Sequence, residues 1–380
     1  MAARECGILA HNPIYFFTMI VFPIFKVFFF TSMMNTGVPQ ELPCGIVDLD
    51  NTSTTRSLIR RLDAMETTRV AATYSNVNEA RSAIQRGEIY AFLYIPRNTT
   101  SDLMAQRQPS ISIYYSSVVM MAGALLYRDM RIVGMLGSLS VAATKLSALG
   151  KSEGEIKSFV QPIAVDVHPV NNPGINYNVY LSTFMVPGVL MLFFFIVTVY
   201  SVGTELKFNR SREWMQLSGG NAWVAITGKL LPQFLIFFSM MAFYMLYVFG
   251  VMGFPHQGGL LRILLLAVLT VTSAEGFAVF MFCIMPSLRM SMSICSLWAV
   301  LGLSMGGATY PVFAMDGVLE TLSWLFPLRH YYMIYQIAVF NGYPLSDCWI
   351  HVVILTAFSL MPLLDAHRLR KAMIEYVYIP

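Results

Sequence analysis

Six long apolar segments constrain this chain more than any other feature of its sequence. Each is about as long as the roughly 20 apolar residues that an α-helix needs to cross a lipid bilayer. Of the 380 residues, 56% are hydrophobic and only 12% are charged, whereas roughly a quarter charged is usual for a soluble domain. The sequence therefore predicts a polytopic α-helical membrane protein, with spans at residues 13–34, 178–203, 224–253, 260–285, 290–313 and 348–364.

The region between the first two spans, residues 37–176, differs in composition. Its apolar runs shorten to strand length and are rich in Ile, Val and Tyr, which is typical of strands. Helical patterns at 53–65, 77–85 and 120–149 alternate with predicted strands at 42–48, 69–74, 89–95, 110–116 and 163–170. This alternation predicts an inserted α/β domain. Its single histidine, His168, has no Ser or Cys motif near it, so the domain shows no catalytic constellation.

The segment 202–233 is short, polar and basic, and it lies between two spans. Short loops rich in Lys and Arg are retained in the cytoplasm. If both termini are cytoplasmic, the inside holds nine basic residues and the outside holds only Arg262 and Arg329; the nine are Arg4, Lys207, Arg210, Arg212, Lys229, Arg289, Arg368, Arg370 and Lys371. We therefore expect a cytoplasmic loop at 204–223 and an extracytoplasmic α/β domain.

The remaining segments are expected to follow the membrane surface. Residues 1–12 suit an interfacial helix, and 372–380 form a cytoplasmic tail after the spans of 178–371. Residues 313–347 are broken by Gly and Pro and crowded with aromatic side chains, which favours one or two re-entrant or interfacial helices on the outer side.

Lys26 and Glu275 are the clearest ionisable residues within predicted spans, and such residues are functional candidates. At a rise of 1.5 Å per residue, Lys26 lies about 20 Å above the inner end of its span and Glu275 about 22 Å below the outer end of its own. A direct salt bridge is thus not expected, and Lys26 is better explained by snorkelling to the outer surface. For Glu275 two interpretations stay open: it lines a substrate pathway, or it makes a structural hydrogen bond to a neighbouring span.

Gly302, Gly306 and Gly307 form a small-x-x-x-small surface in the fifth span, which allows helices to approach closely. Gly302 and Gly306 are therefore candidates for a dimer contact, although such motifs are frequent in ordinary spans. Five cysteines are scattered without C-x-x-C spacing, which argues against a metal or redox site. Cys44 and Cys348 fall on the same predicted side, so a disulfide between them stays an open alternative.

The surroundings of Gly228 and Lys229 lack the glycine spacing and the Ser or Thr of a phosphate-binding loop. The chain is therefore not expected to hydrolyse ATP alone or to bind a cofactor. A net charge of +4 without a long basic run gives no indication of a nucleic-acid partner.

The order of these features resembles the type-2 ATP-binding-cassette (ABC) exporter permeases, in the branch with a large extracytoplasmic domain between the first two spans. The similarity extends over essentially the whole chain. It is carried by the topology and by three motifs, namely Glu205-Leu206-Lys207 followed by Ser211-Arg212-Glu213-Trp214-Met215, then Gly228-Lys229-Leu230-Leu231-Pro232, and then Leu325-Phe326-Pro327-Leu328-Arg329-His330-Tyr331. The sequence departs from the family pattern at Asn209-Arg210, where family members often have Gly-Thr. This difference affects the expected turn before the loop helix.

The resemblance implies that the loop after the second span is a coupling helix that docks into a separate ATPase subunit, which binds ATP and Mg. The contact residues would be Arg212, Glu213, Trp214, Met215 and Leu217, with Glu205 and Lys207 at the membrane edge. The alternative is an ordinary charged loop that only fixes the topology.

The implied function is a non-enzymatic permease subunit of an exporter for a hydrophobic or amphiphilic substrate. It would sit in a bacterial inner membrane with a second permease copy or a homologue, and a periplasmic adaptor protein is a further expected partner. A different class of function is a membrane-anchored receptor or assembly scaffold whose outer α/β domain binds a partner.

Overall fold

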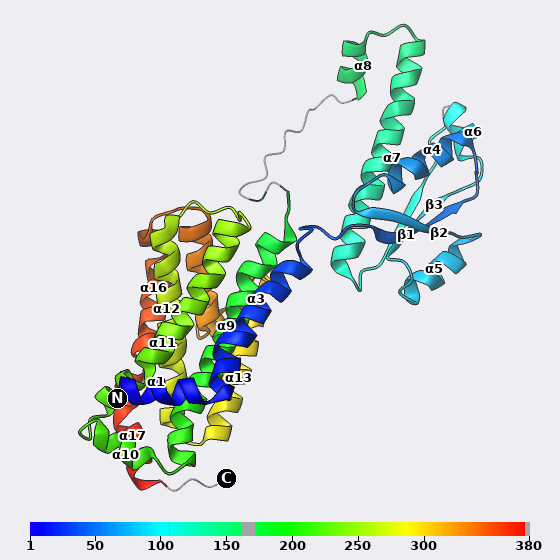
Figure 1. Cartoon of the computed structure of the whole chain (residues 1–380). Coiled ribbons are helices and arrows are strands. Elements are labelled where there is room, and N and C mark those ends of the chain that lie inside the picture. Colours follow the sequence, from blue (N-terminus) through cyan, green and yellow to red (C-terminus); the bar gives the residue numbers. More distant parts are fainter. Residues whose placement is uncertain (106, 161–171, 173, 377–380) are drawn as a thin grey trace. The chain divides into compact units, whose positions relative to one another are not determined.

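The computed structural model describes residues 1–105, 107–160, 172 and 174–376, and the chain divides into two units (Figure 1). The membrane unit combines Met1–Asn35 with Val170–Pro380, and the inserted unit comprises Thr36–Pro169. The membrane unit is helical and the inserted unit contains a small sheet. The predicted fold class, a polytopic helical membrane protein with an inserted α/β domain, is thereby confirmed.

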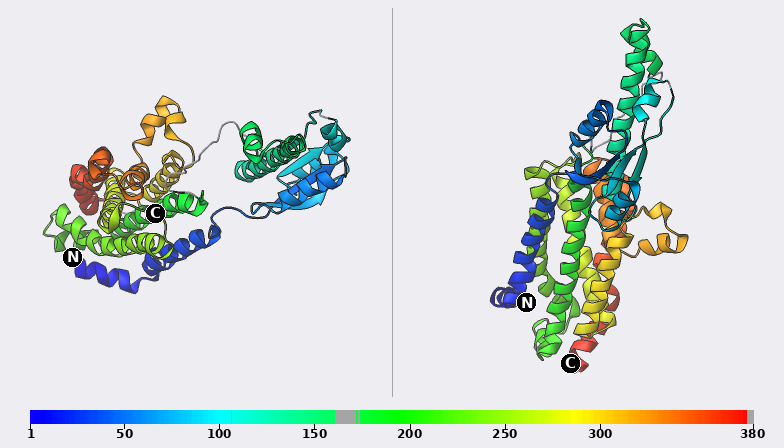
Figure 2. Two further views of the ribbon diagram at one scale, coloured as in Figure 1. Left: turned by 90° about the horizontal axis from the view of Figure 1, so that it is seen from above. Right: turned by 90° about the vertical axis from the view of Figure 1, so that its right-hand side faces the viewer.

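Within the described residues, six helical segments are long and apolar enough to cross a membrane. Views from two sides in Figure 2 show them running alongside one another. They are α2 (Pro13–Phe16) continued by a π-helical turn and α3 (Phe22–Met33); α9 (Tyr177–Lys207); α11 (Ala222–Leu246) continued by a π-helical turn (Tyr247–Val251); α12 (Gly259–Ile284); α13 (Leu288–Met305); and α16 (Trp349–Leu360) continued by α17 (Pro362–Glu375).

The fifth span ends at Met305, eight residues before the predicted end at residue 313. The reason is local, because Gly307 has a φ of 95°, which no right-handed helix accommodates. The sixth span runs further than predicted, to Glu375, across a kink at Asp365 (φ −124°).

The centre of the membrane unit is formed by α9 and α12, whose side chains are mostly buried. Gly276 on α12 explains how α16 can pack so closely against it. A Cβ atom at this position would lie 2.4 Å from the carbonyl oxygen of Phe358 and 2.7 Å from Cα of Ser359. Only a residue without a side chain therefore allows this helix contact.

The segment predicted to be re-entrant contains α14 (Gly317–Ser323) and α15 (Pro327–Ile334), with a π-helical turn at Tyr335–Phe340. The part that carries α14 projects from the side of the bundle, in gold in Figure 2, whereas α15 is buried against α12, α13 and α16. His330 of α15 contacts His351 of α16 through the two Nδ1 atoms, which are 2.8 Å apart. The segment thus contains two short α-helices, and their position at the outer membrane surface stays a prediction.

The inserted unit has a four-stranded sheet among its described residues, in the order β2-β1-β3-β4. The strands are β1 (Leu42–Asp48), β2 (Thr68–Thr73), β3 (Ala91–Ile95) and β4 (Ser112–Tyr115). β1 is parallel to β2 and β3, and β4 is antiparallel to β3. The predicted strand at 163–170 and His168 lie outside the described residues.

Helices cover both faces of this sheet (Figure 1). α4 (Ser53–Asp63) and α7 (Met120–Ala148) bury Leu62, Leu126 and Met130 against one face. α5 (Val77–Gln85) buries Ala80 and Ala83 against the other. The short helices α6 (Thr99–Met104) and α8 (Glu153–Val160) were not predicted from the sequence.

The disulfide between Cys44 and Cys348, left open in the sequence analysis, is not formed in the structure. Both side chains are free thiols and buried.

Candidate functional site

A charged cluster lies where α1 (Ala2–His11) meets the ends of α9 and α11. Arg4 donates two parallel hydrogen bonds to Glu205, from Nη1 to Oε1 and from Nη2 to Oε2, each 3.0 Å long. Lys229 Nζ donates to Glu5 Oε2 at 2.7 Å and to Glu205 Oε1 at 2.8 Å. We call these four residues the ion cluster; it joins three helices that are far apart in the chain.

The ion cluster is buried and electrically balanced. Glu5 and Lys229 are each 2% exposed and Glu205 is 1% exposed. Two cations face two carboxylates, so the formal charges cancel. Removing charges from water costs several kcal/mol per ion, and only close pairing with further hydrogen bonds compensates for it. The hydrogen bonding of the Arg4 guanidinium to the Glu205 carboxylate is also the main cause of the raised pKa of Arg4.

Two uncharged side chains complete the hydrogen bonds of Glu5. Ser201 Oγ donates to Glu5 Oε1 at 2.9 Å. Gln233 Nε2 donates to Glu5 Oε1 at 3.2 Å and to Ser201 Oγ at 2.6 Å. Since Ser201 and Glu205 are four residues apart on α9, and Lys229 and Gln233 are four apart on α11, each pair lies on one helix face.

The short helix α10 (Ser211–Leu217) rests directly on the ion cluster. Lys229 Nζ lies 5.4 Å from the ring centre of Trp214, which is fully buried. A cation over an aromatic face is attracted by the ring quadrupole. On its other side, α10 packs against α17, where Arg212 Nε donates to the carbonyl oxygen of Ile374 at 3.3 Å. α10 is therefore connected to the ends of several spans at once.

The turn into α10 depends on Asn209, which has a φ of 58°. This is the left-handed region, which asparagine tolerates better than most residues other than glycine. The chain reverses here, with Arg210 N donating to the carbonyl oxygen of Glu205 at 2.8 Å. Asn209 thus provides the backbone conformation that a glycine would give at the position where the sequence departs from the family pattern.

The structure divides the seven predicted coupling residues into two groups. Lys207, Arg212, Glu213 and Leu217 are exposed, whereas Glu205, Trp214 and Met215 are buried. The exposed group is available to a partner. The buried group holds α10 in place, and Glu205 does so within the ion cluster and not at a free edge.

The roles of Arg4, Glu5, Ser201 and Gln233 were not predicted from the sequence, and Lys229 was not assigned to an ion pair. The signal that could have found them is the four-residue spacing of polar residues at the ends of two consecutive apolar helices. The partners on α1 had no such signal, because they are about 200 residues away in the chain.

Other predicted site residues lie elsewhere. Glu275 on α12 is 4% exposed, and its Oε1 atom has no hydrogen-bond partner among the described residues. Lys26 lies over four phenylalanine rings of its own span, with Nζ 5.0 Å from the centre of the nearest, Phe22. Among the described residues, no ion pair joins Lys26 to Glu275.

Gly302 and Gly306 face other parts of the same chain. A Cβ atom at Gly306 would lie 2.4 Å from the ring of Phe184, and one at Gly302 would lie 3.6 Å from the ring of Phe326. The close approach that these glycines allow is thus used within the chain, and their contact with a second copy stays a prediction.

The six apolar helices define a multi-pass membrane protein, and the ends of three of its helices are joined to the short helix α10 through the ion cluster. Comparison with known families agrees. The family model for ABC-2 family transporter proteins matches residues 13–364, which is nearly the entire chain. The chain belongs to this family and is a membrane permease of an ABC transporter. A comparison with curated protein sequences gives no match.

Proposed function

We propose that the chain is the permease subunit of an ABC exporter that moves a hydrophobic or amphiphilic substrate out of the cytoplasm or the inner leaflet. A separate ATPase subunit, which binds ATP and Mg and hydrolyses the ATP, docks on the exposed face of α10. The observation that carries the proposal is α10 itself: an exposed face formed by two charged side chains and one apolar side chain, Arg212, Glu213 and Leu217, backed by a buried face that rests on the ion cluster.

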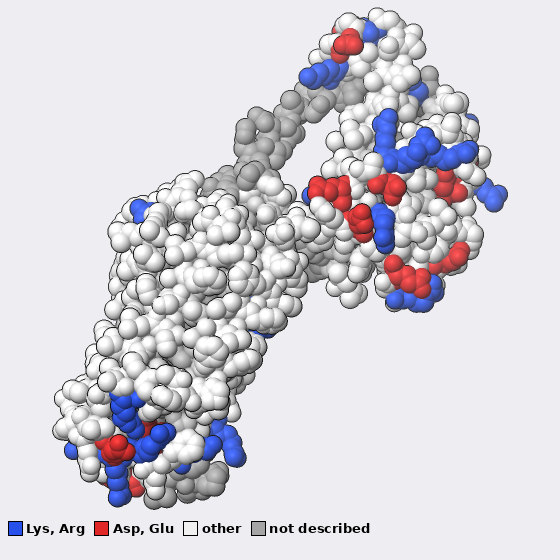
Figure 3. Space-filling model, viewed as in Figure 1, with Lys and Arg blue, Asp and Glu red and all other residues white. Residues whose placement is uncertain are grey.

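The distribution of charge supports a cytoplasmic position for α10 and both termini. In Figure 3 the long side of the membrane unit is almost free of charged residues, and they gather at the end that carries α1, α10 and α17. Basic residues at one end of a bundle favour the cytoplasmic side. The inserted unit would then be extracytoplasmic, where it is available to a periplasmic adaptor protein.

The ion cluster gives a physical route from the ATPase to the spans. A displacement of α10 acts on Lys229 through Trp214, and Lys229 is bonded to α1 and α9 as well as being part of α11. We propose that these helices move as one body during alternating access. Two permease copies, or one copy and a homologous partner, would enclose the pathway, and Glu275 is a candidate residue along it.

Two substitutions that add positive charge to the exposed face of α10 test the docking surface. The variant Glu213→Arg with Leu217→Arg alters two exposed side chains and leaves Trp214 in place. When the permease is co-expressed with its ABC ATPase subunit, we expect co-purification of the ATPase to fall at least tenfold relative to the unchanged permease. ATP hydrolysis by the reconstituted complex should fall in parallel.

The control is Asp347→Arg, a similar charge change at an exposed residue just before α16, away from α10. It should co-purify the ATPase as the unchanged protein does, and all variants should elute as folded protein on size exclusion. Normal co-purification and ATP hydrolysis in the Glu213→Arg, Leu217→Arg variant would refute the assignment of α10.

A further inference from the structure

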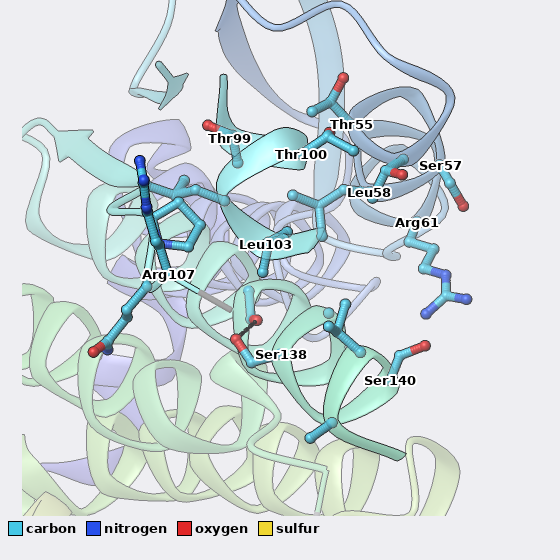
Figure 4. A pocket seen from close by; sticks show the side chains of 18 of the residues that line it. Thr55, Ser57, Leu58, Arg61, Thr99, Thr100, Leu103, Arg107, Ser138 and Ser140 are labelled. Atoms are coloured by element: carbon cyan, nitrogen blue, oxygen red, sulfur yellow. Dashed lines mark hydrogen bonds between the residues drawn. The ribbon is translucent and has the colours of Figure 1, made fainter. Parts of the chain in front are cut away.

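The inserted unit contains a pocket of about 640 Å³ between α4, α6 and α7 (Figure 4). This volume lies within the range of roughly 300–1,000 Å³ that is usual for small-molecule sites. None of the residues used above for coupling to an ATPase contributes to it. The pocket is therefore distinct from the surface proposed to dock an ATPase.

The lining of the pocket is apolar in the middle and polar around it. Figure 4 shows Leu58 and Leu103 in the middle, with Arg61 and Arg107 at opposite ends. Hydroxyl groups border the apolar surface, contributed by Thr55, Ser57, Thr99 and Thr100 on one side and by Ser138 and Ser140 on the other. An elongated molecule with an apolar body and a polar end matches this arrangement.

The charge of the lining has one sign. Three cationic residues, Arg61, Arg107 and Lys145, line the pocket, and its described lining residues include no carboxylate. Lys145 Nζ donates to the carbonyl oxygen of Leu103 at 2.9 Å, and Arg107 lies 3.5 Å from Asp102. Arg61 forms no ion pair with the described residues. The pocket therefore favours an anionic group over a neutral or cationic one.

The walls of the pocket are held together by specific bonds. Asp50 Oδ2, in the loop between β1 and α4, accepts hydrogen bonds from Thr100 N at 3.1 Å and Thr100 Oγ1 at 2.5 Å. Thr52 and Thr100 also join through their hydroxyls at 2.7 Å. These bonds tie α4 to α6, and Lys145 ties α7 to α6. A preformed site loses less entropy when a ligand binds.

Gly134 on α7 keeps part of the pocket open. A Cβ atom at this position would have no heavy atom within 4 Å, although Gly134 is one of the lining residues. Because Gly134 is a lining residue with open space at its Cβ position, a larger side chain there is expected to take up part of the pocket. The position thus offers a way to fill the pocket while the helix is kept.

We propose that this pocket binds a single-chain amphiphile with one anionic head group, such as a carboxylate. The apolar chain lies over Leu58 and Leu103, and the head group pairs with Arg61 or Arg107. The proposal does not rest on the function proposed above, because it concerns residues of the inserted unit alone.

The test uses the full chain in nanodiscs of neutral phosphatidylcholine and the fluorescent probe 11-(dansylamino)undecanoic acid. We expect a saturable rise in dansyl fluorescence above that of empty nanodiscs. The corresponding dansyl alcohol, which has the same chain and no charge, should bind at least fivefold more weakly.

Two variants and two matched controls locate the binding. Arg61→Glu with Arg107→Glu should weaken binding of the acid at least fivefold, whereas Arg60→Glu, an exposed residue of the same helix outside the pocket, should change it less than twofold. Gly134→Leu should abolish the saturable signal. Gly154→Leu, at an open position on α8, should leave it unchanged.

Three results would overturn the proposal. The first is a signal no greater than that of empty nanodiscs, which would show that the pocket does not bind the anionic amphiphile and would favour another kind of ligand, such as a protein segment. The second is equal binding by all variants, which would place the probe elsewhere. The third is equal affinity for the acid and the alcohol, which would exclude selection of an anionic head group. The arginine variant alters only exposed side chains, so it remains informative if Gly134→Leu does not fold.

Discussion

Removal of Lys229 is the sharpest test of the ion cluster. Its Nζ atom lies 2.7 Å from Glu5 Oε2 and 2.8 Å from Glu205 Oε1, and all three side chains are at most 2% exposed. Lys229→Met leaves two buried carboxylates facing only Arg4. Since loss of one partner from a buried ion pair costs about 3–5 kcal/mol, we expect a decrease of this size in the free energy of unfolding.

A second substitution separates charge imbalance from lost packing. In the variant Lys229→Met with Glu5→Gln, one cation and one anion remain, and they are the doubly bonded pair Arg4 and Glu205. The amide of glutamine can still accept the hydrogen bond from Ser201. Interacting residues show coupling energies of about 0.5–3 kcal/mol, so the double variant should recover about 2 kcal/mol relative to Lys229→Met alone.

Unfolding in sodium dodecyl sulfate, followed by tryptophan fluorescence, measures these free energies in the purified full chain. The matched control is Lys207→Met, because Lys207 is exposed and lies in none of these ion pairs. An exposed substitution of this kind changes stability by at most about 0.5 kcal/mol. Equal destabilisation by Lys229→Met and Lys207→Met, or strict additivity in the double variant, would refute the role assigned to the ion cluster.

Two further predictions concern backbone geometry and use the same unfolding assay. At Asn209, where φ is 58°, we expect replacement by Gly to be nearly neutral and replacement by Val to cost about 1–2 kcal/mol, because a β-branched residue does not tolerate the left-handed conformation; equal stability of the two variants would contradict this. At Gly276, replacement by Ala should cost about 1–3 kcal/mol, because the new Cβ atom would meet the backbone of α16. The control is Gly250→Ala, where a Cβ atom has open space, and a loss no larger than that of the control would show that α12 and α16 are not tightly packed.

The positions of the spans could be predicted from the sequence because hydrophobicity over 20 residues is a local property. The same is true of β1 and α5, whose observed bounds, Leu42–Asp48 and Val77–Gln85, are those predicted. The end of the fifth span was missed because it depends on one backbone angle, at Gly307. Hydropathy averages over a window and does not register such a change.

The ion cluster could not be predicted because its partners are distant in the chain. Glu5 and Lys229 are separated by 224 positions, and no local pattern pairs them. In the sequence, Arg4 and Lys229 were counted as positive charges that fix orientation, and neither was paired with a carboxylate. Both interpretations are compatible, since a basic residue at the end of a span contributes to topology and also neutralises a buried carboxylate.

The hydrogen bonds around α10 indicate which part of this region is able to move. Within the ion cluster every charged group is bonded to an opposite charge. In contrast, Arg210 Nε and Trp214 Nε1, at the start of α10 and within it, are buried without partners among the described residues. A buried donor left without a partner costs about 1–3 kcal/mol.

A shift of α10 that gives these two donors new partners would therefore gain free energy, whereas a shift that opened the ion cluster would lose it. We infer that a docked ATPase displaces α10 relative to the ion cluster by a small amount and then carries the ion cluster, with the ends of α1, α9 and α11, as a single body. In this proposal the two parts of the region have different tasks: α10 adapts to the ATPase, and the ion cluster transmits the movement to the spans.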